Sequence, residues 1–410
     1  MPNKASTKLI LKNGIALVGP ELRETPFGSL AVSGDKIVGL SEASPSDSDG
    51  VVFDVGGAYV LPGLVDAHVH FDLAAQPAAY ERWTDPNAAL VRSLTCLHNG
   101  LVALRSGITA VRDLGSVDRL VIDYARRVEQ GTLIGPRIAA AGRPITITGG
   151  HCAQYGRTAS GPDDAREAVR EQVGAGARVI KVMATGGIST PGHPDAAQFT
   201  LEELTAAVNE AHNFGLQVAA HAHAAAGIRM ALEAGVDTIE HAGFADEATL
   251  EMIKQYGRTL VPTVSALNNI ADGAGIPADT VHKSLQARET YRANTAKAID
   301  AGVRIAAGTD AGTALNPLGG LVDELEMYCQ RGMSVVEAIR SATVNAGPLV
   351  QSQVGTIEVG FRADLLVVAS DPRQDLAALR QPLAVIARGR RVPQSWLTET
   401  IDELAEVVAG

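Results

Sequence analysis

From residue 60 onwards, short apolar runs of strand length alternate with stretches in which apolar residues recur at helical spacing. This alternation is typical of βα units, in which helices join parallel strands. Eight runs are suited to such strands: residues 64–70, 109–114, 137–141, 179–183, 217–221, 238–241, 259–263 and 304–308. Eight βα units predict an α/β fold built on a (β/α)8 TIM barrel over residues 60–356.

The stretches between these runs carry helix signals of their own. Examples are residues 163–173, 201–214, 224–234, 247–256 and 282–301. Thr200 stands before one of these stretches and Glu203 follows three residues later, which is the spacing of a capping box. We therefore expect a helix to begin directly after Thr200.

Both ends of the chain are instead rich in short strands and turns. Near the start, strand-like runs cover residues 8–11, 29–32, 36–40 and 51–55, with turns predicted at Asn13-Gly14 and at residues 33–35. Near the end, strands return at residues 367–368 and 383–387, among turns at residues 355, 360 and 371–372. We predict that residues 1–59 and 357–410 build one small, discontinuous β-sandwich domain, whose polar tail near residues 399–406 suits a helix.

Composition narrows the classes of function. The chain of 410 residues is 46% hydrophobic and has a net charge of −11, whereas nucleic-acid binders gather Lys and Arg on one face. Its apolar runs are shorter than the roughly 18 residues that cross a bilayer, and the polar residues 1–7 lack the apolar core of a secretory signal. We expect a cytoplasmic globular protein that binds neither nucleic acid nor membranes.

The three cysteines do not suggest a disulfide framework. Cys96, Cys152 and Cys329 are far apart and lack the spacing of a zinc knuckle. We expect them to be isolated thiols.

Two histidines stand at the end of the first barrel strand. His68 and His70 are two residues apart, so on a strand both side chains point to one face, here the barrel interior. Either histidine alone would more often be a hydrogen-bonded core residue. The pair at the carboxyl end of an apolar strand, where TIM barrels carry their active sites, favours a shared metal.

Lys181 lies in the apolar run 179–183, where an uncompensated ammonium would cost several kcal/mol. Burial also lowers the pKa of a lysine and makes its amine reactive. The lysine could form a buried ion pair, a Schiff base, or a carbamate with CO2 that bridges two metals. Because four histidines and an aspartate are expected around it, we favour the carbamate.

Three further candidates end other strands. His221 closes the run 217–221, His241 closes 238–241, and Asp310 follows Gly308-Thr309 after the eighth run. An aspartate there can hydrogen-bond a metal-bound water and take its proton, as a general base does. The alternative for Asp310 is a helix cap or a turn residue.

Taken together, these motifs resemble the amidohydrolase superfamily over nearly the whole chain. The resemblance rests on residues 61–70 (LPGLVDAHVH), Lys181, His221, His241, residues 308–312 (GTDAG), and the return segment with residues 355–357, Gly360 and residues 363–365. It implies a binuclear centre: His68 and His70 would bind the more buried ion with Asp310, His221 and His241 would bind the second, and carboxylated Lys181 would bridge both. Zinc is the family's usual ion, and nitrogen and oxygen ligands suit it, although cobalt, manganese and nickel also accept such ligands.

The resemblance also bears on the reaction. Deaminases of this superfamily place a glutamate three residues after the strand-five histidine, and that position here is Ala224. Its absence, with a lysine on strand four, favours amide hydrolysis by two metals. Residues 181–187 (KVMATGG) and 148–151 (TGGH) resemble the branch of metal-dependent Xaa-Pro (prolidase-like) and Xaa-Arg/Lys dipeptidases and ochratoxinase-like amidases. Imidazolonepropionase is a more distant relative of that branch.

In that branch, two residues contact the scissile carbonyl or the tetrahedral oxygen, and the matching positions here are His151 and His223. His223 departs from the tyrosine found at its position in some dipeptidases, which leaves the substrate preference open. The alternatives are a solvated helix-start histidine for His223 and a loop histidine for His151. Cys152 could be proposed as a nucleophile, but hydroxide held between two metals makes a thiolate unnecessary.

We therefore expect a hydrolase that cleaves the amide of a dipeptide, an N-acyl amino acid or a similar carboxylate-bearing amide, ochratoxin-type substrates included. Hydroxide bridging the metals would attack a carbonyl polarised by the second ion and His151, and Asp310 would carry the proton to the leaving amine. Arg112, Arg143 and Arg157 are candidates for the carboxylate anchor, each as readily structural. This branch also suggests a homo-oligomer.

Other classes stay open at this point. A cyclic amidase similar to imidazolonepropionase would open a lactam or imide ring, and a metal-dependent deaminase would release ammonia. A metal-free scaffold of the same fold is a third class, although every ligand position is occupied here.

Overall fold

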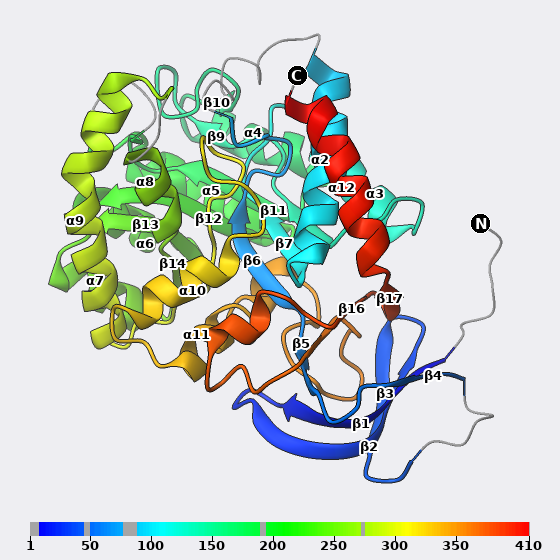
Figure 1. Cartoon of the computed structure of the whole chain (residues 1–410). Coiled ribbons are helices and arrows are strands. Elements are labelled where there is room, and N and C mark those ends of the chain that lie inside the picture. Colours follow the sequence, from blue (N-terminus) through cyan, green and yellow to red (C-terminus); the bar gives the residue numbers. More distant parts are fainter. Residues whose placement is uncertain (1–7, 45–49, 77–87, 189–193, 272–274, 410) are drawn as a thin grey trace.

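The computed structural model describes residues 8–44, 50–76, 88–188, 194–271 and 275–409, and shows a mixed α/β fold. In Figure 1, helices surround a group of parallel strands in the upper part, and a sheet made from the two ends of the chain lies below. Each part agrees with the pattern of apolar residues in its sequence, because the upper part alternates strands with helices and the lower part is mostly strands.

Two parallel sheets form the upper part. The first has the order β6-β7-β8, and the second has the order β10-β9-β11-β12-β13-β14. Their strands are β6 (Leu64–Val69), β7 (Ile108–Asp113), β8 (Arg137–Ala140), β9 (Ile145–Thr146), β10 (Arg157–Thr158), β11 (Val179–Met183), β12 (Gln217–Ala224), β13 (Thr238–Phe244) and β14 (Thr259–Val261). Seven of the eight predicted runs therefore correspond to strands.

Residues 304–308, the eighth predicted strand, form only an isolated parallel bridge between Ile305 and Leu260. The expectation of a regular strand was wrong because the amides of Ala307 and of Thr309, directly after the run, find partners other than the backbone of a neighbouring strand. The amide of Ala307 donates to the Ser341 carbonyl at 2.9 Å. The amide of Thr309 donates to the Asp66 carboxylate at 3.0 Å.

Backbone hydrogen bonds nevertheless connect the two sheets. The Arg178 amide donates to the Ala140 carbonyl at 2.9 Å, which ties the start of β11 to the end of β8. On the other side, the Ala306 amide donates to Leu260 at 3.0 Å and the Ala67 amide donates to Ala307 at 2.9 Å. Residues 304–308 therefore lie between β14 and β6.

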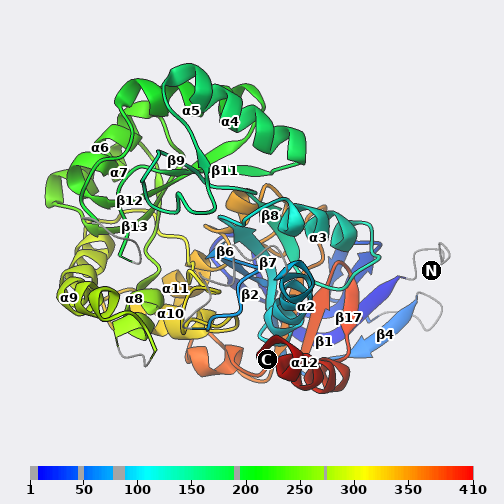
Figure 2. The same ribbon diagram turned by 90° about the horizontal axis from the view of Figure 1, so that it is seen from above.

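The helices lie outside the parallel strands (Figure 2). They are α2 (Ala89–Arg105), α3 (Leu120–Glu129), α4 (Pro162–Ala175), α5 (Leu201–Asn213), α6 (Ala225–Ala234), α7 (Glu247–Gln255), α8 (Val264–Ala271), α9 (Ala278–Asp300), α10 (Leu321–Cys329) and α11 (Val335–Ser341). The capping box of Thr200 with Glu203 is confirmed at the start of α5. No helix within the described residues has the length and apolar character needed to cross a membrane.

The two ends of the chain meet in one eight-stranded sheet with the order β17-β16-β15-β5-β1-β2-β3, in which β4 also pairs with β1. The strands are β1 (Leu9–Val18), β2 (Arg23–Ser33), β3 (Lys36–Ser41), β4 (Val51–Asp54), β5 (Tyr59–Pro62), β15 (Leu365–Val368), β16 (Ala384–Ala387) and β17 (Arg390–Val392). The chain then ends in helix α12 (Gln394–Ala409), which packs along α2 (Figure 1). A helix in the polar tail is therefore confirmed.

The turn predicted at Asn13-Gly14 was wrong, because β1 continues through it. Strands β4 and β5 pair with β1 on either side of this point, and Asn13 adopts a φ of 58°. The Asn13 carbonyl accepts a hydrogen bond from the Gly57 amide at 2.6 Å, so the loop between β4 and β5 wraps around it. A Cβ at Gly14 would lie 2.6 Å from the Phe27 ring, which explains the glycine at this position.

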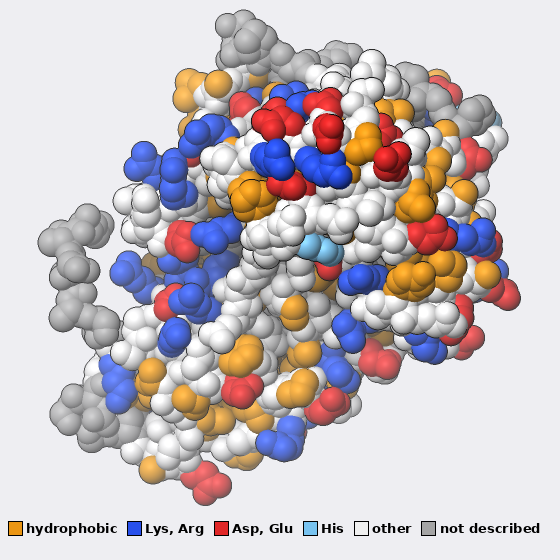
Figure 3. Space-filling model, turned by 180° about the vertical axis from the view of Figure 1, so that it is seen from behind, with side chains coloured by type: hydrophobic (Ala, Val, Ile, Leu, Met, Phe, Trp, Pro, Cys, Tyr) orange, Lys and Arg blue, Asp and Glu red, His pale blue; other side chains and the backbone are white. Residues whose placement is uncertain are grey.

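The outer surface mixes charges of both signs. The face in Figure 3 carries acidic and basic side chains next to one another, with apolar side chains between them. All three cysteines are free, as expected, and Cys96 and Cys152 are buried.

Candidate metal centre

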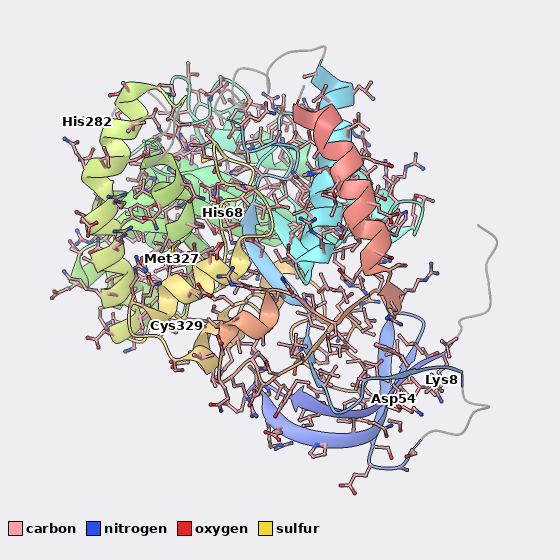
Figure 4. The ribbon with its side chains drawn as sticks, in the orientation of Figure 1. Lys8, Asp54, His68, His282, Met327 and Cys329 are labelled. Carbon is pink, nitrogen blue, oxygen red and sulfur yellow. The ribbon has the colours of Figure 1, made fainter. Side chains whose placement is uncertain are left out.

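All eight residues predicted as metal ligands or as contacts of the carbonyl oxygen line one cavity. They are His68, His70, His151, Lys181, His221, His223, His241 and Asp310. Figure 4 shows His68 in the midst of the surrounding elements, whereas His282 lies at the periphery on α9. The strand β6 carries His68, β11 carries Lys181, and β12 and β13 carry the histidines of the opposite side.

His68, His70 and Asp310 form a compact group of potential metal ligands, with one ligand atom from each lying within 4.8 Å of the others. The Oδ1 atom of Asp310 is 3.5 Å from Nε2 of His68 and 3.1 Å from Nε2 of His70. The other ring nitrogen of each histidine is already held. Nδ1 of His68 lies 2.9 Å from Glu240 and Nδ1 of His70 lies 3.0 Å from the Gly115 carbonyl. Such outer partners orient a histidine for a metal.

An ionic network holds the Nδ1 side of the His68 ring. Arg112 is fully buried and donates to the Ala67 carbonyl at 2.7 Å, to Thr238 at 3.0 Å and to Glu240 at 2.8 Å. Burial would raise the pKa of Glu240, but Arg112 and His68 outweigh it and lower this pKa to about 2. Burial and the charge of Lys181 lower the pKa of His68 to about 4. Glu240 is therefore ionised and His68 neutral, as a metal ligand must be.

Lys181 is buried near the carboxylates of Glu240 and Asp310 but forms no hydrogen bond with them. Its side chain is about 1% exposed, and its Nζ atom has no hydrogen-bond partner. Burial lowers the pKa of Lys181 to about 8. A buried amine without a partner is costly, and its neutral form is a nucleophile.

The remaining histidines form a second group. The ring centroid of His221 lies 4.7 Å from that of His241, 4.3 Å from that of His151 and 4.6 Å from that of His223. Nε2 of His221 lies 2.9 Å from the Gly186 carbonyl, and Nδ1 of His241 lies 2.7 Å from Oγ1 of Thr263. These contacts leave Nδ1 of His221 and Nε2 of His241 for a metal. Burial holds the pKa of both rings well below the usual value, so both are neutral.

Sequence reasoning missed a tyrosine in this second group. The Tyr291 hydroxyl on α9 lies 3.0 Å from Nδ1 of His223, and burial lowers the pKa of that histidine to about 3. Tyr291 passes close to Gly243, where a Cβ would lie 1.7 Å from the tyrosine ring. A tyrosine inside a long helix gives no signal of this contact in the sequence. Glu240 was also missed, although a glutamate within an apolar strand is a signal in the sequence that a buried partner of opposite charge lies nearby.

Backbone strain is concentrated at the cavity. His241, Asp310, Cys152 and Thr263 have φ angles of 77°, 58°, 62° and 54°, which non-glycine residues rarely adopt. Asp310 is also held by its own amide, which donates to the His68 carbonyl at 2.7 Å. Residues in such conformations cost about 1–3 kcal/mol each and often mark functional sites.

The three arginines considered as carboxylate anchors are engaged elsewhere. Arg112 lies inside the ionic network described above, and Arg157 pairs with Asp164 and Glu171. Arg143 donates to the carbonyls of Tyr155 and Gly156. Cys152 accepts a hydrogen bond from Tyr155 at 2.8 Å, and burial raises the pKa of its thiol to about 12. That pKa argues against a thiolate nucleophile.

Comparison with known proteins gives consistent matches. The model of the Amidohydrolase family matches residues 59–392. Ochratoxinase from Aspergillus niger is 32% identical over 370 residues, which cover 80% of this chain and 73% of that protein. Its crystal structure has a TM-score of 0.83 at 28% identity, with 95% of this chain and 96% of that chain covered.

Two further proteins are similar to this chain over most of its length. A crystal structure of a Xaa-Pro dipeptidase with bound methionine in the active site has a TM-score of 0.86 at 30% identity, covering 94% of this chain and 100% of that chain. Imidazolonepropionase from Rhizobium rhizogenes is 25% identical over 362 residues, which cover 80% of this chain and 82% of that protein.

Proposed function

Because this chain belongs to the amidohydrolase family and is a hydrolase of carbon–nitrogen bonds, we propose that it cleaves the amide bond of a dipeptide, an N-acyl amino acid or a similar carboxylate-bearing amide. The matches to ochratoxinase and to a Xaa-Pro dipeptidase support this range of substrates. The observation that carries the proposal is the buried amine of Lys181, which has no hydrogen-bond partner although ligand-type side chains line the same cavity.

The residues present suit two divalent ions. His68, His70 and Asp310 would hold one ion, and His221 and His241 would hold the other. Lys181, as a carbamate formed from CO2, would supply a further anionic ligand, and its amine would no longer be buried without a hydrogen-bond partner. The nitrogen and oxygen donors suit zinc. When bound, the ions would supply Lewis acidity that activates water and polarises the carbonyl.

Asp310 would move the proton. Burial raises the pKa of a carboxyl, but His68, His70 and Lys181 outweigh it and hold the pKa of Asp310 below its usual value. An ionised carboxylate at this position can accept a proton from the attacking water and pass it to the leaving amine.

His151 and His223 would bind the carbonyl oxygen. Burial lowers the pKa of each ring to about 3, so both are neutral and each has a single N–H to donate. If the Tyr291 hydroxyl donates to Nδ1 of His223, the proton of His223 is on Nε2. A donor fixed in this way can stabilise the developing oxyanion without reorganising.

We also infer that the parallel strands close into a (β/α)8 barrel and that residues 1–59 with 357–410 form the small discontinuous β-sandwich domain. The hydrogen bonds from Arg178 to Ala140, from Ala306 to Leu260 and from Ala67 to Ala307 support the closure. The shared sheet of the two chain ends supports the second domain. Homo-oligomerisation stays a prediction.

The test combines turnover with detection of the carbamate. Protein loaded with zinc and 13C-bicarbonate is screened against dipeptides and N-acyl amino acids, with released amine as the readout. We expect hydrolysis, two ions per chain, and a carbamate signal in the 13C NMR spectrum. The Lys181→Ala variant should lose all three, whereas Lys297→Ala, which changes a half-exposed lysine paired with Glu247, should keep them. Full turnover with two ions in Lys181→Ala would overturn the proposal.

A further inference from the structure

One wall of the metal cavity is apolar. Ala266, Leu267 and Ile270 on α8 line the cavity, as does Ile188 in the segment after β11. The three α8 positions share one face of the helix, because Ile270 is four residues from Ala266 and three from Leu267, and residues at these spacings are neighbours on the helix surface. Leu267 and Ile188 belong to one hydrophobic cluster with Ala287 and Tyr291, against which Phe244 packs.

The opposite face of α8 is polar and fully engaged, so the helix cannot easily turn. Asn268 accepts a hydrogen bond from Arg292 at 3.0 Å, and Asn269 donates to Asn316 at 3.1 Å. At the start of the helix, the amides of Val264 and Ser265 both donate to the buried Glu324 carboxylate at 2.7 Å. The apolar face is thereby held toward the cavity.

Among the residues that the structure describes, this wall offers no cation to a negatively charged group. Of the described residues that line the cavity, only Lys181 is a lysine or arginine, and the proposed function uses its amine for the metals. The nearby charged group is the carboxylate of Asp310, which repels anions. A carboxylate placed on α8 would lose its hydration without compensation, whereas an apolar group there would gain by leaving water.

We propose that Ile188, Ala266, Leu267 and Ile270 form an acyl subsite that receives an uncharged aliphatic or aromatic acyl group. This inference rests on the proposed amide hydrolysis and adds the orientation of the substrate. Hydrolysis divides an N-acyl amino acid into an acyl half and an amine half, which leaves as the free amino acid. The amine half carries the carboxylate, so only the acyl half can be free of charge. The acyl half therefore lies on α8, and the carboxylate half lies away from it.

The first experiment varies only the acyl group. N-acetyl, N-hexanoyl, N-benzoyl and N-succinyl derivatives of L-leucine share the same amine half and are compared by kcat/KM on the zinc-loaded protein. We expect kcat/KM to rise by up to about fourfold for each added methylene from acetyl to hexanoyl. The succinyl derivative should be cleaved no better than the acetyl one. Succinyl and hexanoyl derivatives cleaved within about twofold of each other would overturn the subsite.

Variants of Leu267 locate the effect on α8. Leu267→Arg should invert the preference, so that the succinyl derivative becomes better than the hexanoyl one. Leu267→Ala, a milder change, should flatten the dependence of kcat/KM on the length of the acyl chain. Leu285→Arg is the matched control, because Leu285 on α9 is 47% exposed and lies outside the cavity lining. An unchanged preference in both Leu267 variants would also overturn the subsite.

Binding separates a failure of this inference from a failure of the proposed function. Acetohydroxamate, hexanohydroxamate and succinyl monohydroxamate share a metal-binding head and differ only in the tail. Differences in their affinity for the zinc-loaded protein, measured by calorimetric titration, therefore report on the tail alone. We expect hexanohydroxamate to bind more tightly than the other two, and Leu267→Arg to favour the succinyl tail. If all three hydroxamates bound with equal affinity, the subsite would be overturned and the proposed function would stand. If the protein neither bound the hydroxamates nor hydrolysed the amides, the proposed function would be overturned, and the subsite with it.

Discussion

The cavity has two sides that hold their histidines by different means. On the ionic side, defined as His68, His70, Asp310, Glu240 and Arg112, carboxylate oxygens lie 2.9–3.5 Å from ring nitrogens of the two histidines, and Arg112 holds Glu240 at 2.8 Å. On the neutral side, defined as His221, His223 and His241, the partners are the Gly186 carbonyl, the Tyr291 hydroxyl and the Thr263 hydroxyl. Removing one partner of a buried charge leaves the other uncompensated, whereas losing a neutral hydrogen bond costs about 1 kcal/mol. The ionic side should therefore be the more sensitive one.

Arg112→Met is the strongest way to test this comparison. It leaves the Glu240 carboxylate buried without its cation, so we expect the metal-free protein to lose about 3–5 kcal/mol of unfolding free energy in urea. The double variant Arg112→Met with Glu240→Gln should recover part of the loss, because no ionised partner stays behind. Arg170→Met, which breaks the more exposed pair with Glu210, should change stability far less, because solvent screens this pair. Equal losses in Arg112→Met and Arg170→Met would refute the contrast.

The pH dependence of stability probes a second buried cation, Lys181, whose amine lacks the hydrogen-bond partners that the Arg112 guanidinium has. Its pKa falls from 10.5 to about 8 on burial, so between these pH values the unfolded chain binds more protons than the folded one. The unfolding free energy of metal-free, bicarbonate-free protein should then rise by about 2–3 kcal/mol as pH increases from 8 to 10.5. Lys181→Met should remove this rise. The same slope in both proteins would show that Lys181 is not the group responsible.

Metal affinity distinguishes the two sides directly. Glu240→Gln keeps the shape of the side chain but removes the charge that holds Nδ1 of His68, so zinc affinity should fall about 10- to 100-fold in a chelator competition assay. Thr263→Ala removes the neutral partner of His241 and should weaken zinc binding by less than about tenfold. A larger effect in Thr263→Ala would reverse the order proposed for the two sides.

The smallest expected effect concerns turnover alone. Tyr291→Phe leaves His223 in place but removes the hydroxyl at 3.0 Å from its Nδ1, so kcat should fall roughly fivefold to tenfold while KM and zinc content stay the same. Tyr256→Phe, at an exposed tyrosine, is the control and should leave kcat unchanged. A changed zinc content in Tyr291→Phe would mean that the tyrosine supports the fold of the metal site instead.

Local patterns in the sequence were sufficient for most elements. Apolar runs predicted seven of the parallel strands, and the capping box at Thr200 fixed the start of α5. They failed where a partner distant in the chain decides the conformation. Asn13-Gly14 has the composition of a turn but continues β1, because β4 and β5 pair along the strand on either side of it. Residues 304–308 have the composition of a strand, but the Ala307 amide donates to the Ser341 carbonyl, and the Thr309 amide directly after the run donates to the Asp66 side chain, so neither pairs with the backbone of a neighbouring strand.

By itself, the sequence determined which chemical groups this protein offers and that most of them lie on or directly after predicted strands, since both follow from residue type and spacing. Only the tertiary structure decided which of those groups are already engaged. It placed Arg112 against Glu240, Tyr291 against His223 and the apolar face of α8 toward the cavity. Contacts between residues far apart in the chain depend on how whole elements pack, and no local pattern encodes that packing.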